Sequence, residues 1–341
     1  MLLKTSSAPF LHQETSVSEI MRQVLYALTP GIVVYVYFLG WGIVVNILLA
    51  SVTALTCEAL MLWLRNRPIR PFLTDNSALV TAWLLAMALP PFVPWWVTVL
   101  GTAFGLIFAK HLYGGLGYNP FNPAVVGYMV LLISFPLEMT RWPALPSLSG
   151  YYPGILDSLS IIFTGQAMGG LTVDALSSAT PLDTMKTELA QFYTVAEIQG
   201  NPLFSTFAAK GWEWIGGTFF LGGCWLIYKR VITWHIPVAV LGTLFLISGC
   251  FFLIDSDLNP SPLFHILTGG SIIGAFFIAT DPVSAATSNK GRLFYGVGIG
   301  LLIYIIRTWG GYPDGVAFAV LLMNMTVPTI DYYTKPRVFG H

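Results

Sequence analysis

The sequence has little charge for its length. Asp, Glu, Lys and Arg together make up 9% of its 341 residues, against about 25% in an average soluble protein. Hydrophobic residues reach 55%, and the mean hydropathy is +0.71. A soluble globule of this size needs more charge to cover its surface, so the composition favours a lipid bilayer as the solvent. The formal net charge is zero, which leaves no global field that would attract nucleic acid.

Cysteine is also scarce. Cys57, Cys224 and Cys250 lie far apart in apolar runs and are interpreted as core thiols. There is no CxxC pair and no Cys/His cluster, which argues against a zinc site, an iron–sulfur cluster or a c-type haem. The histidines have no ligand spacing, and no Gly-rich nucleotide motif occurs. The sequence therefore predicts no metal site and no catalytic residue.

Long apolar runs are what the sequence has in abundance. The first run, Val24–Leu64, has Glu58 as its single charged residue and is long enough for two helices of about 20 residues, with a turn at 39–42. Eight further runs follow, at Ser77–Leu89, Trp95–Ala109, Ala124–Pro136, Trp214–Tyr228, Ile236–Ile254, Phe264–Thr280, Leu293–Ile306 and Val316–Ile330. The sequence predicts an all-α integral membrane protein with ten transmembrane helices. Several runs are short, and either broken helices or polar helix ends account for them.

The basic residues indicate an orientation. An even number of spans puts both termini on one side, and no cleaved leader is expected at the polar N-terminus. Counting the termini as cytoplasmic puts twelve Lys and Arg residues inside and four outside, the four being Arg141, Lys186, Lys210 and Arg307. This positive-inside bias predicts cytoplasmic termini and a long loop, 138–213, on the other side.

An internal repeat divides the chain. At an offset of 194 residues the pattern Leu-Thr-x-x-Ser recurs at 73–77 and 267–271, and Gly-Tyr recurs at 117–118 and 311–312. Each half then holds five spans, an odd number, so the halves lie in opposite orientations, an arrangement common in transporters. The predicted parts are an N-terminal segment 1–23, a first five-helix repeat 24–137, the loop 138–213, a second five-helix repeat 214–331 and a tail 332–341.

The loop contains a distinct stretch, Asp-Ala-Leu-Ser-Ser-Ala-Thr-Pro-Leu-Asp, at 174–183. From the residues alone, Thr180 caps a short helix that begins at Pro181, a position that suits proline. The stretch also resembles the acceptor motif of membrane flavoproteins in the Rnf and sodium-pumping quinone reductase families. In those families a flavin transferase links the phosphate of FMN to the last threonine as a phosphoester. The resemblance implies that Thr180 is the attachment residue.

The same resemblance assigns the residues before Thr180. Asp174, Ser177, Ser178 and Ala179 match the recognition sequence, with Ser178 where many members have Gly. Small neighbours keep a hydroxyl accessible to the transferase, and a tethered flavin cannot diffuse away.

The similarity runs the length of the chain. It includes Ala27-Leu28-Thr29-Pro30-Gly31, the stretch from Thr74 to Thr81, the stretch from Gly117 to Ala124, and that from Ala279 to Ser284. It implies membership of an Rnf-type complex that couples ferredoxin/NAD redox chemistry to Na⁺ or H⁺ movement across the bacterial inner membrane. The implied partners are the A, B, C, E and G subunits of Rnf, a flavin transferase and membrane lipid. Relatives also suggest a noncovalent riboflavin between the halves.

Polar residues in the apolar runs are candidates for a second site. Glu58 is the only acid well inside a run, and a buried charge is costly unless it has a role or a partner. Snorkelling or pairing with Arg65 is its structural alternative. Asn119 and Asn122 precede the fifth span, and Thr280 and Asp281 end the eighth. These five residues are candidates for an ion or second-flavin site, with helix capping as the alternative.

Two other functions remain open from the residues. An inverted repeat with broken helices fits a solute channel or transporter as well as a redox subunit. A membrane scaffold is the third interpretation. A flavin retained after denaturation, and lost in Thr180→Ala, distinguishes the redox function from a transporter. Full turnover of the complex in Thr180→Ala would favour the scaffold.

Overall fold

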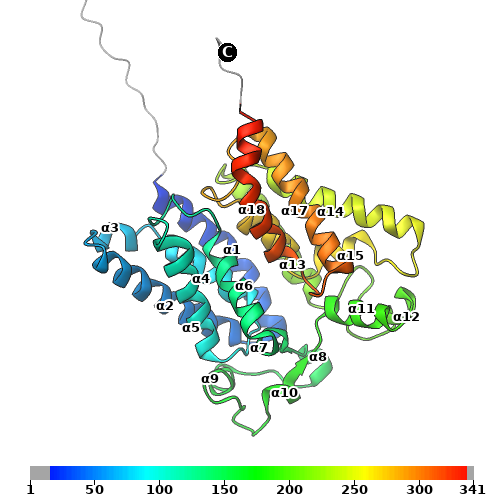
Figure 1. Ribbon diagram of the computed structural model, residues 1–341. Coiled ribbons are helices and arrows are strands. Elements are labelled where there is room, and N and C mark those ends of the chain that lie inside the picture. The colour runs from blue at the N-terminus through cyan, green and yellow to red at the C-terminus, as the bar shows by residue number, and fades with distance from the viewer. Residues whose placement is uncertain (1–15, 336–341) are drawn as a thin grey trace, which may run out of the picture.

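A computed structural model describes residues 16–335, which form a helical bundle with a smaller loop region at one end (Figure 1). The first apolar run folds into α1 (Val17–Leu39) and α2 (Gly42–Leu64). They turn at Gly40, whose φ of 87° suits glycine, as the sequence predicts. α1 begins before its apolar run because Ser16 caps it, accepting a hydrogen bond from Glu19 N at 3.2 Å. Lys4 and Arg337, two of the basic residues counted for the orientation, lie outside the described residues.

The helices of the bundle fall into two groups along the chain. The first group is α1, α2, α3 (Ile69–Leu73), α4 (Ser77–Ala88), α5 (Trp95–Phe104), the π-helix η1 (Gly105–His111) and α6 (Pro123–Ser134). The second group is α13 (Trp212–Tyr228), α14 (His235–Ile254), α15 (Pro262–Leu267), α16 (Ser271–Ile273), the π-helix η2 (Gly274–Ile278), α17 (Asn289–Trp309) and α18 (Val316–Tyr333). Five helices, α1, α2, α14, α17 and α18, are long and apolar enough to cross a membrane, and shorter apolar helices accompany them. The chain is therefore a multi-pass, all-α membrane protein.

Two helical paths are interrupted. α3 and α4 are separated at 74–76, and α15 and α16 are separated at 268–270. The second interruption divides the run Phe264–Thr280, which the sequence predicts as one span. Thr74 and Thr268 end α3 and α15, and each donates its hydroxyl to the carbonyl four residues earlier. Hydroxyl bonds of this kind replace part of the lost backbone bonding.

The two groups of helices lie side by side, with the blue-to-teal part of the chain beside the yellow-to-red part (Figure 1). α1 packs against α13, and α6 packs against α18. The starting residues of the groups correspond: α2, α4, α5 and α6 begin at 42, 77, 95 and 123, and α14, α16, α17 and α18 begin at 235, 271, 289 and 316. Each later start lies within one residue of the offset of 194 found in the sequence.

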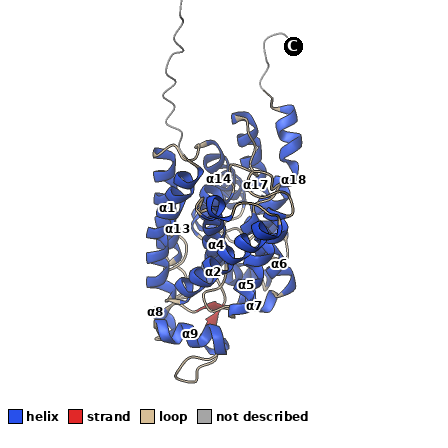
Figure 2. Cartoon of the chain, turned by 90° about the vertical axis from the view of Figure 1, so that its left-hand side faces the viewer, coloured by secondary structure: helices blue, strands red, loops and turns tan. Residues whose placement is uncertain are grey.

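The loop region lies at the end of the bundle opposite to the described chain ends (Figures 1 and 2). We call these ends the loop end and the terminus end. The loop region comprises α7 (Pro136–Thr140), β1 (Trp142–Pro143), α8 (Pro146–Ser149), α9 (Ile155–Thr164), α10 (Val173–Leu176), β2 (Ser177–Ser178), α11 (Pro181–Ala190) and α12 (Val195–Gln199). Its ordered elements hold the predicted flavin-attachment motif against the bundle.

Candidate functional site

The attachment motif is held by a short antiparallel sheet. β2, which is Ser177–Ser178, pairs with β1 so that Ser178 faces Trp142. Ala144 N donates to Leu176 O at 2.9 Å, which extends the same pairing by one bond. β1 follows α7, the short helix after α6, so the strand pair ties the motif to the end of a bundle helix. The motif is thus a positioned segment rather than a free turn.

Thr180 is the N-cap of α11, as the Thr-Pro sequence predicts. Its Oγ1 accepts a hydrogen bond from Asp183 N at 3.2 Å, and its carbonyl accepts from Thr184 N at 2.8 Å. Pro181 occupies the first helical position, where its missing N–H costs nothing. A capping oxygen accepts through a lone pair, so the cap leaves the position of the hydroxyl hydrogen available for an ester bond.

Thr180 lies on the wall of a cavity of about 190 Å³ between the two groups of helices. We call it the loop-end cavity. Its walls are mostly apolar and come from α1, α4, α6, α7, β1, the start of α11, α13, α15, α16, η2 and α18. Aromatic side chains are prominent among them: Tyr35, Tyr128, Trp142, Trp212, Phe219 and Tyr312. The Tyr35 hydroxyl is buried and has no hydrogen-bond partner within residues 16–335. An apolar, aromatic cavity with few polar groups suits a flat aromatic ligand.

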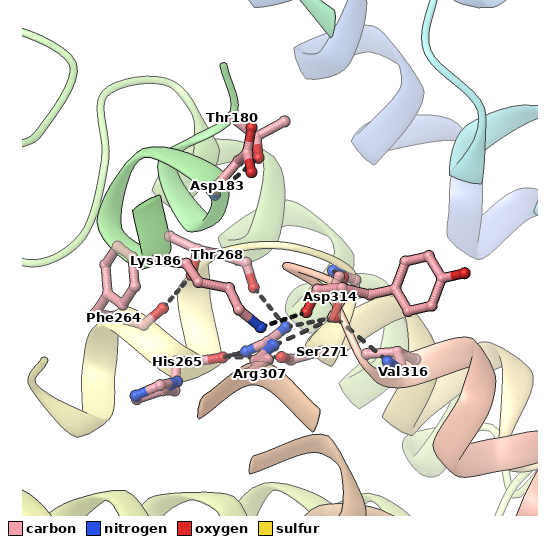
Figure 3. A network of polar contacts seen from close by, with 12 residues as sticks. Thr180, Asp183, Lys186, Phe264, His265, Thr268, Ser271, Arg307, Asp314 and Val316 are labelled. Atoms are coloured by element: carbon pink, nitrogen blue, oxygen red, sulfur yellow. Dashed lines mark hydrogen bonds and ion pairs between the residues drawn. The ribbon is translucent and has the colours of Figure 1, made fainter. Parts of the chain in front are cut away.

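Lys186 fastens α11 to the bundle (Figure 3). Its ammonium donates to three carbonyl oxygens just past and within the end of α17, those of Ile306 at 3.3 Å, Gly310 at 2.5 Å and Tyr312 at 2.9 Å. The Ile306 carbonyl also accepts from Gly310 N, whereas carbonyls at and beyond the end of a helix have no partner within the helix. Burial lowers the pKa of the Lys186 ammonium, an effect that the nearby Asp183 carboxylate opposes. The helix that starts at Thr180 is therefore anchored to the second group of helices.

A second charged network lies beside this clamp and borders the loop-end cavity. Arg307, 4% exposed, donates to the Asp314 carboxylate at 3.0 Å and to the carbonyl oxygens of His265 and Thr268. Asp314 also accepts from Gly270 N at 2.7 Å. The network joins α17, the start of α18 and the interruption between α15 and α16, as Figure 3 shows. It gives the cavity a fixed acidic group at its edge.

The other motif residues face outward. The Asp174 side chain is 71% exposed and pairs with Arg141 at 3.2 Å, an exposed contact worth about 0–1 kcal/mol. Ser178 and Ala179 are exposed, and Ser177 is half-buried. These residues are accessible from the loop end, whereas Thr180 faces the cavity.

A second cavity, of about 140 Å³, lies at the terminus end of the same interface. Asn119, Asn122, Thr280 and Asp281, four of the five residues that the sequence predicts for a second site, line it together. Asn119 is 3% exposed, and its Oδ1 has no hydrogen-bond partner in the described part of the chain. The capping alternative is also met, because Asn122 Oδ1 caps α6 by accepting from Ala124 N at 3.0 Å. Leu84 lines both cavities.

Comparison with known proteins shows which family this chain is similar to. The model of the family described as "NQR2, RnfD, RnfE family" matches residues 4–340. The D subunit of an ion-translocating oxidoreductase complex from Aliivibrio salmonicida (strain LFI1238) is 51% identical over 98% of each chain. The D subunits of the same name from Citrobacter koseri and Escherichia fergusonii are each 50% identical, covering all of this chain and 100% and 99% of their own. The chain belongs to the NQR2, RnfD, RnfE family.

In this NQR2, RnfD, RnfE family member Glu58 is paired, but not with Arg65, which the sequence offers as the alternative to a functional role. Glu58 is 1% exposed and accepts two hydrogen bonds from the Lys110 ammonium, at 2.8 and 2.9 Å. His111 Nε2 lies 3.2 Å from the same carboxylate. Arg65 instead donates to the carbonyl of His111. Arg65 lies seven positions after Glu58, about two helical turns along α2, and so is too far along the helix to pair with it. Lys110 in η1 lies at the same depth as Glu58 and pairs with it instead.

Glu58 does not line the terminus-end cavity but is joined to it. Lys110 lines that cavity and also donates to Ser77 Oγ at 2.9 Å. Lys110 therefore links Glu58 to the cavity that the other four candidate residues line.

Sequence reasoning missed several polar residues of both sites in this family member. Lys110 and the clamp residue Lys186 have no local signature, because their partners come from distant segments. Tyr35 and Asp314 have none either, because the loop-end cavity that they line forms only when the helices pack. Arg307 and Lys110, which the positive-inside count treats as loop residues, are buried. No group of three or more His, Cys, Asp or Glu side chains within residues 16–335 is arranged to hold a metal ion.

Proposed function

We propose that this chain is the D subunit of an Rnf-type ion-translocating oxidoreductase, with FMN esterified to Thr180, and that it relays electrons between other subunits. The complex would couple ferredoxin/NAD chemistry to Na⁺ or H⁺ movement, with the A, B, C, E and G subunits as partners. The names of its relatives support a place in such a complex. The observation that carries the cofactor assignment is the position of Thr180, whose side chain lies on the wall of an aromatic cavity.

The residues at the cavity fit a flavin. FMN supplies one- and two-electron redox chemistry when bound, and the protein supplies its orientation and surroundings. Tyr35, Tyr128 and Trp142 offer aromatic surface for a flat ring. The unpartnered hydroxyl of Tyr35 offers a donor or acceptor for the polar edge of that ring. Thr180 tethers the group and thereby sets its effective concentration.

The start of α11 fits the phosphate. A helix N-terminus presents N–H groups and the positive end of the helix dipole, which favour an anion. Thr180 Oγ1 already lies within hydrogen-bond distance of Asp183 N, at 3.2 Å. Asp183 is the one acidic side chain in the first turn of α11. Its negative charge counteracts the attraction of the helix N-terminus for a phosphate. The exposed Asp174, Ser178 and Ala179 and the half-buried Ser177 would be read by the flavin transferase.

We propose ten membrane spans in two inverted halves, with both termini cytoplasmic and the flavin loop periplasmic. The recurrence of helix starts at an offset of 194 residues supports the repeat. Lys110 and Arg307 are buried and are therefore removed from the count of loop charges. The cytoplasmic count falls from twelve to eleven, and the count on the other side falls from four to three. The bias that supports this orientation in the bacterial inner membrane is unchanged.

The terminus-end cavity is the proposed second site. Asn119, Asn122, Thr280 and Asp281 offer amide, hydroxyl and carboxylate oxygens there, which suit a hard cation or the polar edge of a noncovalent riboflavin. The unpartnered Oδ1 of Asn119 supports a ligand at this place. Glu58 contributes through Lys110.

A solute transporter is the second candidate function, favoured by the interruptions at 74–76 and 268–270. One experiment separates the two. Protein made together with its flavin transferase should give a peptide containing Thr180 that is heavier by one FMN, and should stay yellow after denaturation. Thr180→Ala should lose the adduct and, with the cap, about 1 kcal/mol of local stability. Thr180→Ser retains a capping hydroxyl and serves as the control for folding. An unmodified wild-type peptide would refute the redox function.

A further inference from the structure

The helix α9 exposes large apolar side chains on one of its sides. Ile155 is 48% exposed, Leu156 60%, Leu159 37% and Phe163 51%. At 100° per residue these four positions fall within one arc of about 100°. Ile161 and Ile162, on the neighbouring side, are each 1% exposed and so are buried against protein. A soluble surface seldom carries an apolar stripe of this kind.

The polar residues of α9 occupy a third side. Asp157, Ser160 and Thr164 fall together on the helical wheel, between the exposed apolar side and the buried side. Each of the three is half-buried or exposed. The helix therefore has one side against protein, one apolar side that is largely exposed in the described chain, and one polar side. Helices that lie in a membrane interface share this division.

The charge distribution along the loop points to the same environment. The segment 142–173 contains one charged residue, Asp157, whereas 174–213 contains seven. The charged part includes α11 and α12 and is suited to water. The charge-poor part surrounds α9 and contains Tyr151 and Tyr152, residue types common at the level of lipid headgroups.

α9 also continues the surface of the spanning helices. It packs against α2, and the Phe163 ring stacks on Trp95 with centroids 6.3 Å apart. Trp95 is the first residue of α5 and is 42% exposed; Trp41, just before α2, is 38% exposed. α9 thus lies at the loop end beside the ends of two bundle helices (Figures 1 and 2). Exposed tryptophans at helix ends mark the lipid–water boundary.

We propose that α9 is a membrane-interface helix whose exposed apolar side is immersed among lipid acyl chains at the loop end. Such helices bury their apolar face about 5–10 Å into the boundary between headgroups and acyl chains. The buried side of α9 contributes Ile161 to a small apolar cluster with Phe92, Ala167 and Leu176. Leu176 directly precedes β2, so the membrane contact of α9 sets the height of the attachment motif above the bilayer. A covering protein subunit is the alternative occupant, and it would exclude both lipid and water from the patch.

Spin labels in the assembled complex test this proposal. Leu156→Cys and Leu159→Cys, in a chain whose three cysteines are replaced by alanine, are labelled with a nitroxide and reconstituted in phospholipid nanodiscs. Oxygen, which concentrates in lipid, and a water-soluble nickel chelate are used as relaxation agents. Leu246→Cys on α14, where the native side chain is 66% exposed, is the lipid control. Ala190→Cys at the end of α11 is the water control.

The proposal predicts a several-fold preference for oxygen over the nickel chelate at positions 156 and 159, as at 246, and the reverse preference at 190. Preference for the nickel chelate on α9 would put this side in water and overturn the proposal. Low accessibility to both agents would show that another subunit covers α9 and would overturn it as well. The result does not depend on the flavin, because neither labelled position lies at Thr180 or in the loop-end cavity.

Discussion

Two buried basic side chains stand at the two interruptions of the helical paths. Lys110 reaches the interruption before α4 through the hydroxyl of Ser77, and Arg307 reaches the one after α15 through the carbonyls of His265 and Thr268. A helix that stops in an apolar environment leaves backbone groups unpaired, which is costly. Lys110 lies in η1, which precedes α6, the last helix of the first group. Arg307 lies in α17, which precedes α18, the last helix of the second group. Arg307 thereby pairs backbone carbonyls at its interruption, whereas Lys110 bonds the side chain that follows the other interruption.

The Lys110–Glu58 pair predicts a specific pattern of stability. Both side chains are 2% exposed, so Lys110→Met leaves a carboxylate without its main partner. We expect this change to destabilise the chain by about 3–5 kcal/mol. In the double variant with Glu58→Gln no charge is stranded, and most of that loss should be recovered. The measurement is the temperature at which the detergent-solubilised protein loses its monodisperse peak.

Arg65→Met is the matched control for this pair. Arg65 lies near the same end of α2 but makes one hydrogen bond, to the His111 carbonyl at 3.2 Å. We expect a change within about 1 kcal/mol. A double variant as unstable as Lys110→Met alone would show that the lysine acts chiefly through Ser77 and not through Glu58.

At the scale of the element, α11 is held at two points, its N-cap and a side chain in its second turn. Thr180 caps it, and Lys186 binds it to carbonyls at the end of α17. Lys186→Met should free the helix from the bundle, because three hydrogen bonds are lost together and the carbonyls of Gly310 and Tyr312 lose a cationic donor. We expect amide hydrogen exchange in 181–190 to become at least several-fold faster.

Two further variants identify the cause. Lys186→Arg keeps a cationic donor and should preserve part of the protection, whereas Thr187→Ala, at an exposed position of the same helix, should leave exchange unchanged. If exchange in Lys186→Met matched that of the wild type, the strand pair and the cap alone would be holding the motif.

The positions of helices follow from the sequence more readily than their interruptions. α4, α5 and α18 begin at Ser77, Trp95 and Val316, the residues at which the apolar runs begin. Local hydropathy suffices there, because the bilayer demands a continuous apolar helix. Hydropathy does not predict the break at 268–270, since it depends on Gly269, with a φ of 65°, and on a hydrogen bond from Gly270 N to Asp314, 44 residues away.

The candidate site shows the same division. The cap at Thr180 follows from the Thr-Pro pair, whose preferences are local. The cavity does not, because its walls extend in sequence from Tyr35 to Ala317 and meet only when the two groups of helices pack. Lys186 resembles any loop lysine in the sequence, and its partners become visible only when α17 ends beside it.

At the scale of the whole molecule, the two groups of helices meet through equivalent members. α1 packs against α13 and α6 against α18, which are the first and last helices of each group. Contacts between equivalent elements are what a two-fold relation between halves requires. Both cavities lie between the two groups of helices, so the distance between the groups determines the shape of the cavities.

The α1–α13 contact depends on small residues, and glycines of α13 allow it to be tested. A Cβ added at Gly222 would overlap the carbonyl oxygen of Ala27 on α1, whereas one added at Gly217 on the same helix would meet nothing within 4 Å. Neither Ala27 nor its carbonyl can move without shifting the helix, so Gly222→Ala must push the halves apart. Overpacking of this kind costs about 1–3 kcal/mol, partly offset by the higher helix propensity of alanine.

We therefore expect Gly222→Ala to lower the thermal midpoint of the purified protein by several degrees, and Gly217→Ala to leave it unchanged or slightly raised. Helices in lipid gain little from hydrophobic burial and associate through close packing, so small residues at their contact matter more than in water. Because both cavities lie between the halves, Gly222→Ala should also increase the mobility of the flavin that we place on Thr180, measured as lower fluorescence anisotropy. Equal midpoints for the two variants would mean that α1 and α13 are farther apart in the membrane, and that the cavities are wider than described.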